Sequence, residues 1–418
     1  MLAPTQVSSR RRLGQSELDL IIDAHERYVT GRPGGKRASL HFIDFSELDL
    51  RGRNLSDADL SGSVFDGAHM AGARLDRANL FGSDLRKADM RGATLVRADL
   101  RGACMRGANL TNADLSGADF REGQITVPDR KAGLSSVRHE ARAGTIDSAI
   151  LKGATLDGSR LDGASAFAAD FTDCSLRGAK LAGANLKDAN LGGANLEGAE
   201  VAGANLENAN FEGAVLTGVD VSRARTLGAR MGGALSGPSE AAKANAPALR
   251  AAIDAHEAWR RSGGKEGAPA QLEEQDLRPL GARLRDAKLT AANLRGACLV
   301  GLDLTGVELQ GANLEGADLR GVTLRGADLR GARLTAANLT KADLRSALLA
   351  GLPLGPGRVT PVSLISAQLR YVQAQCADFT AAILDAADLR GADFTGAILD
   401  GASLNSIETE ATVGLLAA

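Results

Sequence analysis

The sequence is poor in aromatic residues, in cysteine and in long apolar runs. Phe, Trp and Tyr make up 3% of the 418 residues, whereas proteins that bind single-stranded nucleic acid depend on stacking aromatics. The four cysteines show no CxxC spacing, which argues against a zinc site and a disulfide framework. No apolar segment has the length of a membrane-spanning helix. These absences favour a reduced, cytoplasmic protein that does not bind membranes.

Charge and motifs exclude further classes of function. The 49 basic and 51 acidic residues give a net charge of −2, which predicts no bulk attraction to nucleic acid or to acidic membranes. The five histidines form no HExxH pattern, and no GxSxG, P-loop or dinucleotide-binding fingerprint occurs. We therefore expect no catalytic residue, no metal and no cofactor.

Glycine, in contrast, is abundant at 50 residues, and the chain repeats every five residues. Residues 193–214 read GANLEGAEVAGANLENANFEGA. If the apolar centre of each unit is position i, then i−2 is small, i−1 is commonly Asp or Asn, and i+2 is often Gly. Centres recur by fives from Leu40 to Ile125, from Ile146 to Met231 and from Leu284 to Leu404, so repeats cover most of the chain.

A five-residue period excludes a regular helix, because each step would rotate the centre by about 140°. In an extended segment, i−2 and i point inward together and i−1 points to water. Positions i+1 and i+2 then form a turn, and Gly at i+2 suits a type II turn. Units without that Gly, such as 86–90 and 111–115, are expected to use another turn type. If four units close one circuit, residue n lies over residue n+20.

The unit A-(D/N)-L-x-x, as in ADLRG, ANLEG and ADFTG, resembles the pentapeptide-repeat proteins. The resemblance implies an all-β fold, a right-handed quadrilateral β-helix with i inside and a small residue at i−2. Ile43, Leu48 and Arg53 depart from this pattern, which predicts a distorted first circuit.

Two non-repeat segments predict helices that cap the coils. Residues 17–30 have an amphipathic pattern with Ser16 and Asp19 placed as a capping box, and residues 245–264 carry a second copy. Both copies contain DAHE, an aromatic residue three positions after the His, and then GGK. We expect His25 and His256 to be packing or hydrogen-bonding residues. A helix can close the open end of a solenoid, so the sequence predicts two capped domains, 1–235 and 240–418.

Two segments interrupt or strain the repeat. Residues 126–145 break the register and predict an inserted loop, and residues 352–364 keep the spacing but carry three prolines, which predicts a bulge or projecting loop. Projecting loops on rigid scaffolds often bind partners. The candidate partner-contact residues in the first loop are Arg130, Lys131, Arg138 and Arg142.

The family resemblance also suggests a DNA-mimicking modulator of DNA gyrase or another topoisomerase, which requires a long acidic face. The candidate acidic surface comprises Glu197, Glu200, Glu207, Glu212, Asp378, Asp385, Asp388, Asp393 and Asp400. The four glutamates would lie on successive sides of one circuit, forming a ring rather than a stripe. Elsewhere DLR recurs in register and places Asp and Arg on the same outward side, where their charges cancel.

The leading hypothesis is therefore a non-enzymatic protein-binding or scaffold solenoid with a protein partner. The gyrase modulator is the alternative, and an enzyme with an unrecognised site is the third. The C-terminal segment predicts either a seal over the last circuit or a homodimer contact.

Overall fold

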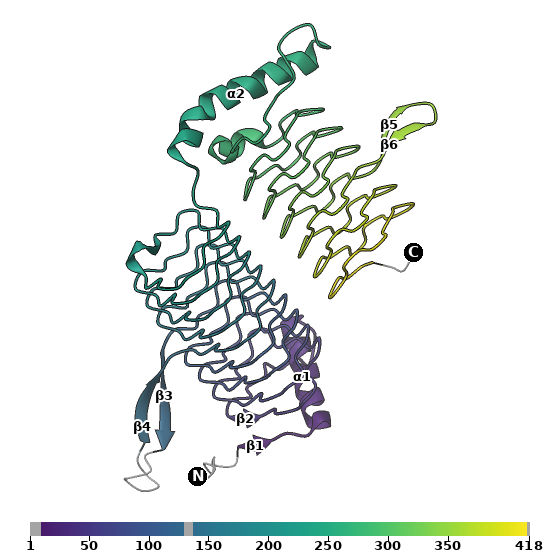
Figure 1. The fold of residues 1–418 in the computed structure, drawn as a ribbon. Coiled ribbons are helices and arrows are strands. Elements are labelled where there is room, and N and C mark those ends of the chain that lie inside the picture. Colours follow the sequence, from purple (N-terminus) through teal and green to yellow (C-terminus); the bar gives the residue numbers. More distant parts are fainter. Residues whose placement is uncertain (1–9, 129–136, 416–418) are drawn as a thin grey trace. The chain divides into compact units, whose positions relative to one another are not determined.

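The computed structural model describes residues 10–128 and 137–415. The chain divides into two compact units, Met1–Gly237 and Pro238–Ala418. Each unit contains a coil of short extended segments joined by tight turns, with one long helix packed on its first circuits (Figure 1).

The coil repeats every 20 residues. Residue n forms a parallel bridge with residue n+20 through most of each unit, as Asp59 does with Asn79 and Asp328 with Leu348. Backbone hydrogen bonds run between successive circuits, such as the one from Leu186 N to Asn205 O at 2.8 Å. Four five-residue units thus make one circuit, which gives the predicted four-sided β-helix.

The turns take a positive φ at position i+2 whether or not the residue is Gly. Gly52 has φ 66°, Lys87 has φ 55° and Asn112 has φ 58°. The prediction that Gly-free units abandon this conformation is therefore wrong. Among the described residues, the non-Gly residues with positive φ include no Val, Ile or Thr, because a branched Cβ crowds the backbone most in this region.

Each coil is filled by its own side chains. Large apolar residues at i and small ones at i−2 are buried along both units, as shown by Leu100 and Ala98 in the first and Leu329 and Ala327 in the second. Phe45 and Phe65 on successive circuits stack with centroids 4.7 Å apart. The inward positions thus leave a packed shaft rather than a pore.

In the first unit, α1 (Gln15–Val29) buries Leu18 and Ile22 against the coil. It begins after Gly14, which provides no side-chain cap, so the predicted capping box is wrong. The short strand β1 (Arg11–Arg12) pairs in parallel with β2 (Ile43–Asp44). The first circuit keeps the 20-residue register, with Asp44 bridged to Val64, so the expected distortion is not observed. The 3₁₀ turn η1 (Val221–Arg223) lies near the end of this coil.

In the second unit, α2 (Glu240–Arg261) begins earlier than predicted and continues through Pro247. The Ser239 hydroxyl accepts the first-turn hydrogen bond from Ala242 N at 3.1 Å. The coil then begins at Leu272 rather than Leu284. Its first circuit contains the 3₁₀ segment η2 (Arg278–Leu284), and bridges there join residues 22 positions apart, such as Gln271 and Asn293.

Two β-hairpins extend from the coils. β3 (Gly123–Pro128) pairs with β4 (Val137–Arg142), and β5 (Leu352–Gly355) pairs with β6 (Arg358–Thr360), both antiparallel. Bridges across the first hairpin join residues 41 apart instead of 20, so it adds 21 residues, and Ile125 lies in β3 rather than at an inward position. Bridges across the second join residues 30 apart, so it adds ten.

Candidate interaction surfaces

The preference for Asp or Asn at i−1 has a backbone cause. The i−1 side chain accepts a hydrogen bond from the N–H of residue i+1, as Asp303 does from Thr305 N at 3.0 Å and Asn109 does from Thr111 N at 3.1 Å. This N–H leaves the strand at the turn, where no neighbouring circuit accepts from it. Solvent exposure alone, the reason given from sequence, does not explain why these two residue types recur.

The predicted cancellation of charge in the DLR units is confirmed. Arg330 Nε lies 2.9 Å from Asp328 Oδ1, and Arg330 Nη2 lies 2.6 Å from Asp328 Oδ2. The same fork-shaped pairing joins Asp49 to Arg51, Asp84 to Arg86, Asp89 to Arg91, Asp99 to Arg101, Asp119 to Arg121, Asp318 to Arg320, Asp343 to Arg345 and Asp388 to Arg390. Much of the wall is therefore locally neutral.

The four candidate glutamates of the first unit are also paired. Their partners lie about one circuit away: Arg177 for Glu197 at 3.3 Å, Lys180 for Glu200, Lys187 for Glu207 at 3.6 Å and Arg230 for Glu212 at 3.8 Å. Three of these pairs have the n to n+20 spacing. The 20-residue register was available from sequence and could have revealed them.

The acidic candidates of the second unit do not form a stripe either. Asp378, Asp385, Asp388 and Asp393 belong to units centred at 379, 384, 389 and 394, which are successive sides of the coil. Asp388 pairs with Arg390 at 2.6 Å. Three of the others accept from neutral groups: Asp378 from the Thr380 hydroxyl at 2.6 Å, Asp385 from the Ser403 hydroxyl at 2.6 Å and Asp393 from Gln375 Nε2 at 2.7 Å. Asp400 is exposed.

The first hairpin carries the candidate partner-contact residues. Arg130 and Lys131 lie outside the described residues, and Arg138 lies in β4. Arg142 lies at the base of the hairpin, where its Nε donates to Gly102 O at 2.6 Å and its Nη2 to Gly82 O at 3.2 Å. The structure therefore places Arg142 against the coil wall, where it anchors the hairpin.

The second hairpin exposes apolar side chains. Leu354 is 54% exposed and Val359 58% exposed. A Cβ built on Gly331 would lie 2.7 Å from the Cβ of Leu352, so this strand lies closely against a glycine of the wall. The predicted bulge or projecting loop is thus a short hairpin anchored at one edge.

The junction between α1 and the coil is built around His25. His25 Nδ1 accepts from Ala38 N at 3.0 Å, and Nε2 lies 2.9 Å from Ser56 O. The ring is therefore neutral with its proton on Nε2, and burial lowers the pKa of His25 below its ordinary value. The inference that this histidine is a hydrogen-bonding residue agrees with these contacts.

Arg53 connects the same junction to the helix. Its guanidinium contacts Asp19 at 3.1 Å, Glu26 at 3.1 Å and Asp23. Rather than intruding on the core, the side chain turns outward to three helical carboxylates. The sequence pattern identified Arg53 as unusual without showing this role.

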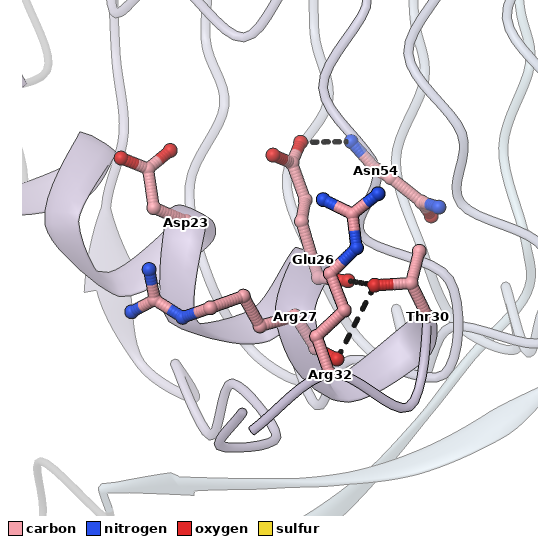
Figure 2. A pocket seen from close by; sticks show the side chains of 6 residues that line it. All are labelled: Asp23, Glu26, Arg27, Thr30, Arg32 and Asn54. Carbon is pink, nitrogen blue, oxygen red and sulfur yellow. Dashed lines mark hydrogen bonds between the residues drawn. The ribbon is translucent and has the colours of Figure 1, made fainter. Parts of the chain in front are cut away.

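A shallow hollow of about 480 Å³ lies beside this junction. Its lining residues are Asp23, Glu26, Arg27, Thr30, Arg32 and Asn54 (Figure 2). Glu26 accepts from Asn54 N at 2.9 Å, and the Thr30 hydroxyl donates to Glu26 O at 2.7 Å. Figure 2 shows these bonds between the helix and the first circuit.

The second unit repeats the construction. His256 is buried, its Nδ1 accepts from Ala270 N at 3.0 Å, and burial lowers its pKa. Arg283 contacts Asp254 at 2.6 Å and Glu257 at 3.1 Å. The shared DAHE motif thus places a His against the coil and its acids around an Arg.

Other chemistry is sparse in the part of the chain that the structure describes. There, no three or more His, Cys, Asp or Glu side chains gather in a way that could hold a metal ion. The four cysteines are free, Cys174 buried and Cys376 exposed. No helix among the described residues is both long and apolar enough to cross a membrane.

The fold and its walls define a four-sided repeat solenoid with a filled interior. A family model described as pentapeptide repeats (8 copies) matches residues 43–82, 73–112, 83–121, 149–188, 169–206, 194–225, 282–326, 312–351 and 363–406. Since these segments cover well over half of the chain, the protein belongs to the pentapeptide-repeat family. Membership carries the right-handed β-helix that the sequence predicted.

Similar solved structures are also pentapeptide-repeat proteins. Rfr23 from the cyanobacterium Cyanothece 51142 shares 29% identity over 33% of this chain and 90% of its own, with a TM-score of 0.24. HetL from Nostoc sp. strain PCC 7120, involved in heterocyst differentiation regulation, shares 21% over 92% of each chain, with a TM-score of 0.13. QnrB1, a plasmid-mediated fluoroquinolone resistance protein, shares 19% over 47% of this chain and 91% of its own, with a TM-score of 0.27. No curated protein matches the chain.

Proposed function

We propose that the protein is a non-enzymatic, protein-binding scaffold built from two capped coil domains, about 1–235 and 240–418. In this proposal α1 and α2 are the caps, because each buries apolar residues against the first circuits of its unit. Cytoplasmic location is part of the proposal and is supported by the free thiols.

The observation that carries the proposal is the contrast between the walls and their interruptions. Regular circuits expose paired charges, while the hairpins leave the wall at defined points on a rigid support. Rigid supports with projecting segments are suited to protein recognition. The hairpin β3–β4 is the proposed partner contact, with Arg130, Lys131 and Arg138 as the contact residues and Arg142 as the anchor.

Affinity capture from the native cell, with the full chain as bait, tests this function. A matched bait lacks residues 122–142, because joining Arg121 to Ala143 leaves the five-residue unit RAGTI and restores the 20-residue register. We expect a protein captured by the full chain to be lost from the shortened one. Capture of no protein contradicts the scaffold function, and equal capture by both baits contradicts the hairpin as the contact.

A DNA-mimicking modulator of DNA gyrase is the second candidate. It is favoured by Asp378, Asp385 and Asp393, whose hydrogen-bond donors are neutral, so their negative charge is not cancelled there. The ring-like placement of these residues counts against it, since a mimic of duplex DNA needs charge along the axis. A gyrase supercoiling assay with excess protein tests it, and unchanged supercoiling excludes this candidate.

Homodimerisation through the C-terminal end is a further proposal. Val413 is 51% exposed and bridges to Asp393, while Leu415 packs partly against the core. An end of this kind offers backbone and apolar surface to a second copy. Light scattering of the full chain and of a Val413→Lys variant tests the contact.

A further inference from the structure

Exposed basic side chains gather where α1 ends and the first circuits begin. We call this set the α1 basic surface, and it consists of Arg27, Arg32, Lys36, Arg37, Arg74, Arg77 and Arg97. All seven are exposed. They come from the last turn of the helix, from the segment that follows it and from one side and corner of the coil.

Bonds and bridges show that the surface is continuous. Arg27 and Arg32 line the hollow whose coil wall is Asn54 (Figure 2), and Arg74 bridges to Asn54 from the next circuit. At the corner, Arg37 Nε donates to Asp57 O at 2.7 Å.

The corner continues along the axis of the coil. Arg77 lies one circuit beyond Asp57 and binds its carboxylate with two bonds of 2.8 and 2.6 Å. Arg97 occupies the same turn position one further circuit along, with Arg77 N bonded to Val96 O between them at 2.8 Å. Successive circuits are spaced by about 4.8 Å, so these groups line one edge.

The surface keeps a positive excess. Asp23 and Glu26 beside the hollow are engaged by Arg53, and Asp57 is engaged by Arg77, whose hydrogen bonds lower the pKa of that carboxyl. Among the described residues, no ion pair neutralises Arg27, Arg32, Lys36, Arg74 or Arg97. Most arginines of the regular wall, in contrast, pair with the Asp two residues earlier.

The second unit is an internal control, because the two junctions can be superposed on their histidine contacts. Ala270 corresponds to Ala38 at Nδ1, and Thr290 corresponds to Ser56 at Nε2. The same correspondence places Ala258 at Arg27, Glu308 at Arg74, Gly311 at Arg77 and Gly331 at Arg97.

A helix can therefore be seated on a coil without this basic surface. Arg77 and Arg97 also hold φ of 57°, a conformation in which Gly costs less. Stability does not account for arginines at these turns, which leaves binding as their use.

We propose that the α1 basic surface docks an acidic, extended segment of a protein partner, an inference that rests on the proposed scaffold function and names the chemistry of one contact. Guanidinium groups recognise carboxylates through paired bonds, as Arg77 already does with Asp57. The hollow beside Arg27 and Arg32 gives a side chain of that segment a place to enter.

Protein is favoured over nucleic acid by two features of the surface. Asp57 and Asp76 lie within it, and fixed carboxylates oppose a continuous phosphate backbone more than a peptide whose acids can be spaced around them. Exposed aromatic side chains are also few here, with Tyr28 at 47% exposure, whereas single strands need successive stacking partners.

The test is direct binding measured by fluorescence anisotropy on the full chain. The probe is a short fluorescein-labelled peptide of alternating Glu and Ser, and the comparison probes are its Lys–Ser counterpart and a single-stranded oligonucleotide of equal charge. The test variant carries the second unit's own residues: Arg27→Ala, Arg74→Glu and Arg97→Gly. The control variant makes equal charge changes at paired arginines: Arg51→Ala, Arg86→Glu and Arg91→Ala.

We expect the test variant to bind the acidic peptide at least about tenfold more weakly, since three exposed contacts of a few tenths to one kcal/mol each are lost. The control variant should change affinity much less, and added salt should weaken wild-type binding. Equal binding by wild type and test variant overturns the proposal, and tighter binding of the oligonucleotide assigns the surface to nucleic acid instead.

The same variants separate this inference from the scaffold function itself. A partner captured from cells by wild type and test variant alike contradicts the α1 basic surface and leaves the scaffold function standing. Failure to capture any protein contradicts the scaffold function. Thermal unfolding checks that the test variant is folded, which Arg97→Gly favours by relieving a positive φ.

Discussion

Alanines at the turns are predicted to cost stability because the chain holds them at positive φ. Ala336, Ala381 and Ala386 of the second unit have φ of 55°, 57° and 58°. The left-handed conformation costs an L-residue roughly 1–2 kcal/mol, while Gly loses roughly 0.5–1 kcal/mol more backbone entropy on folding. Each Ala→Gly change should therefore stabilise by about 0.5–1 kcal/mol, and the three together by about 2 kcal/mol, since separated sites add.

Urea denaturation measures this effect in the second unit selectively. Trp259 is the single tryptophan and lies in α2, so its fluorescence reports on that unit while the first unfolds separately. With a slope of about 2 kcal/mol per molar urea, the triple variant should shift the midpoint upward by about 1 M.

The neighbouring residue provides a matched control. Ala382 is fully buried at i−2, so Ala382→Gly loses a buried methyl and gains no relief at the turn. It should destabilise by about 1–2 kcal/mol. If Ala381→Gly lowers the midpoint as Ala382→Gly does, the assignment of strain to the turn position is wrong.

Three further predictions follow from the junctions, the shaft and the hairpins. Because burial lowers the pKa of His25 and His256 below the ordinary 6.5, the unfolded chain binds more protons below that pH, so stability is full above pH 6.5 and falls as acid is added; His→Gln variants should flatten this slope in urea midpoints measured at several pH values. Leu329→Asp should destabilise the second unit by several kcal/mol, because an inward carboxylate has no partner, and a wild-type melt would contradict the inward position. Deleting 122–142, or deleting 352–361 to leave the unit AGVSL, should keep the far-ultraviolet spectrum and melting temperature nearly unchanged, whereas a deletion five residues longer should not.

The fold could be predicted because a five-residue period leaves few backbones that bury every centre. The same arithmetic determined how well each hairpin could be seen. The hairpin β3–β4 adds 21 residues, which is not a multiple of five, so the register breaks and reveals it. The hairpin β5–β6 adds ten, so Leu354 and Val359 keep the repeat spacing although they are more than half exposed. Periodicity registers an insertion only when its length disturbs the phase.

Turns and helix ends were harder, because they depend on backbone angles rather than on burial. Lys87 and Asn112 take the same sign of φ as Gly at their turn position, since the circuit geometry imposes that angle on whatever residue stands there. The helix α1 begins at Gly14 without a side-chain cap, held by Leu18 and Ile22 against the coil instead. Local signals lose to packing in both cases.

The charges show most clearly how a repeat register converts sequence into surface. Asp and Arg two residues apart meet on one strand, and Lys180 and Glu200, one circuit apart, meet across two. A wall built on this register is neutral wherever either spacing is satisfied. Binding sites for charged partners should then lie where both spacings fail, and Arg74 and Arg97 satisfy neither. If the Arg74 and Arg97 substitutions leave every bound partner in place, the link between unsatisfied spacing and recognition is refuted for this protein.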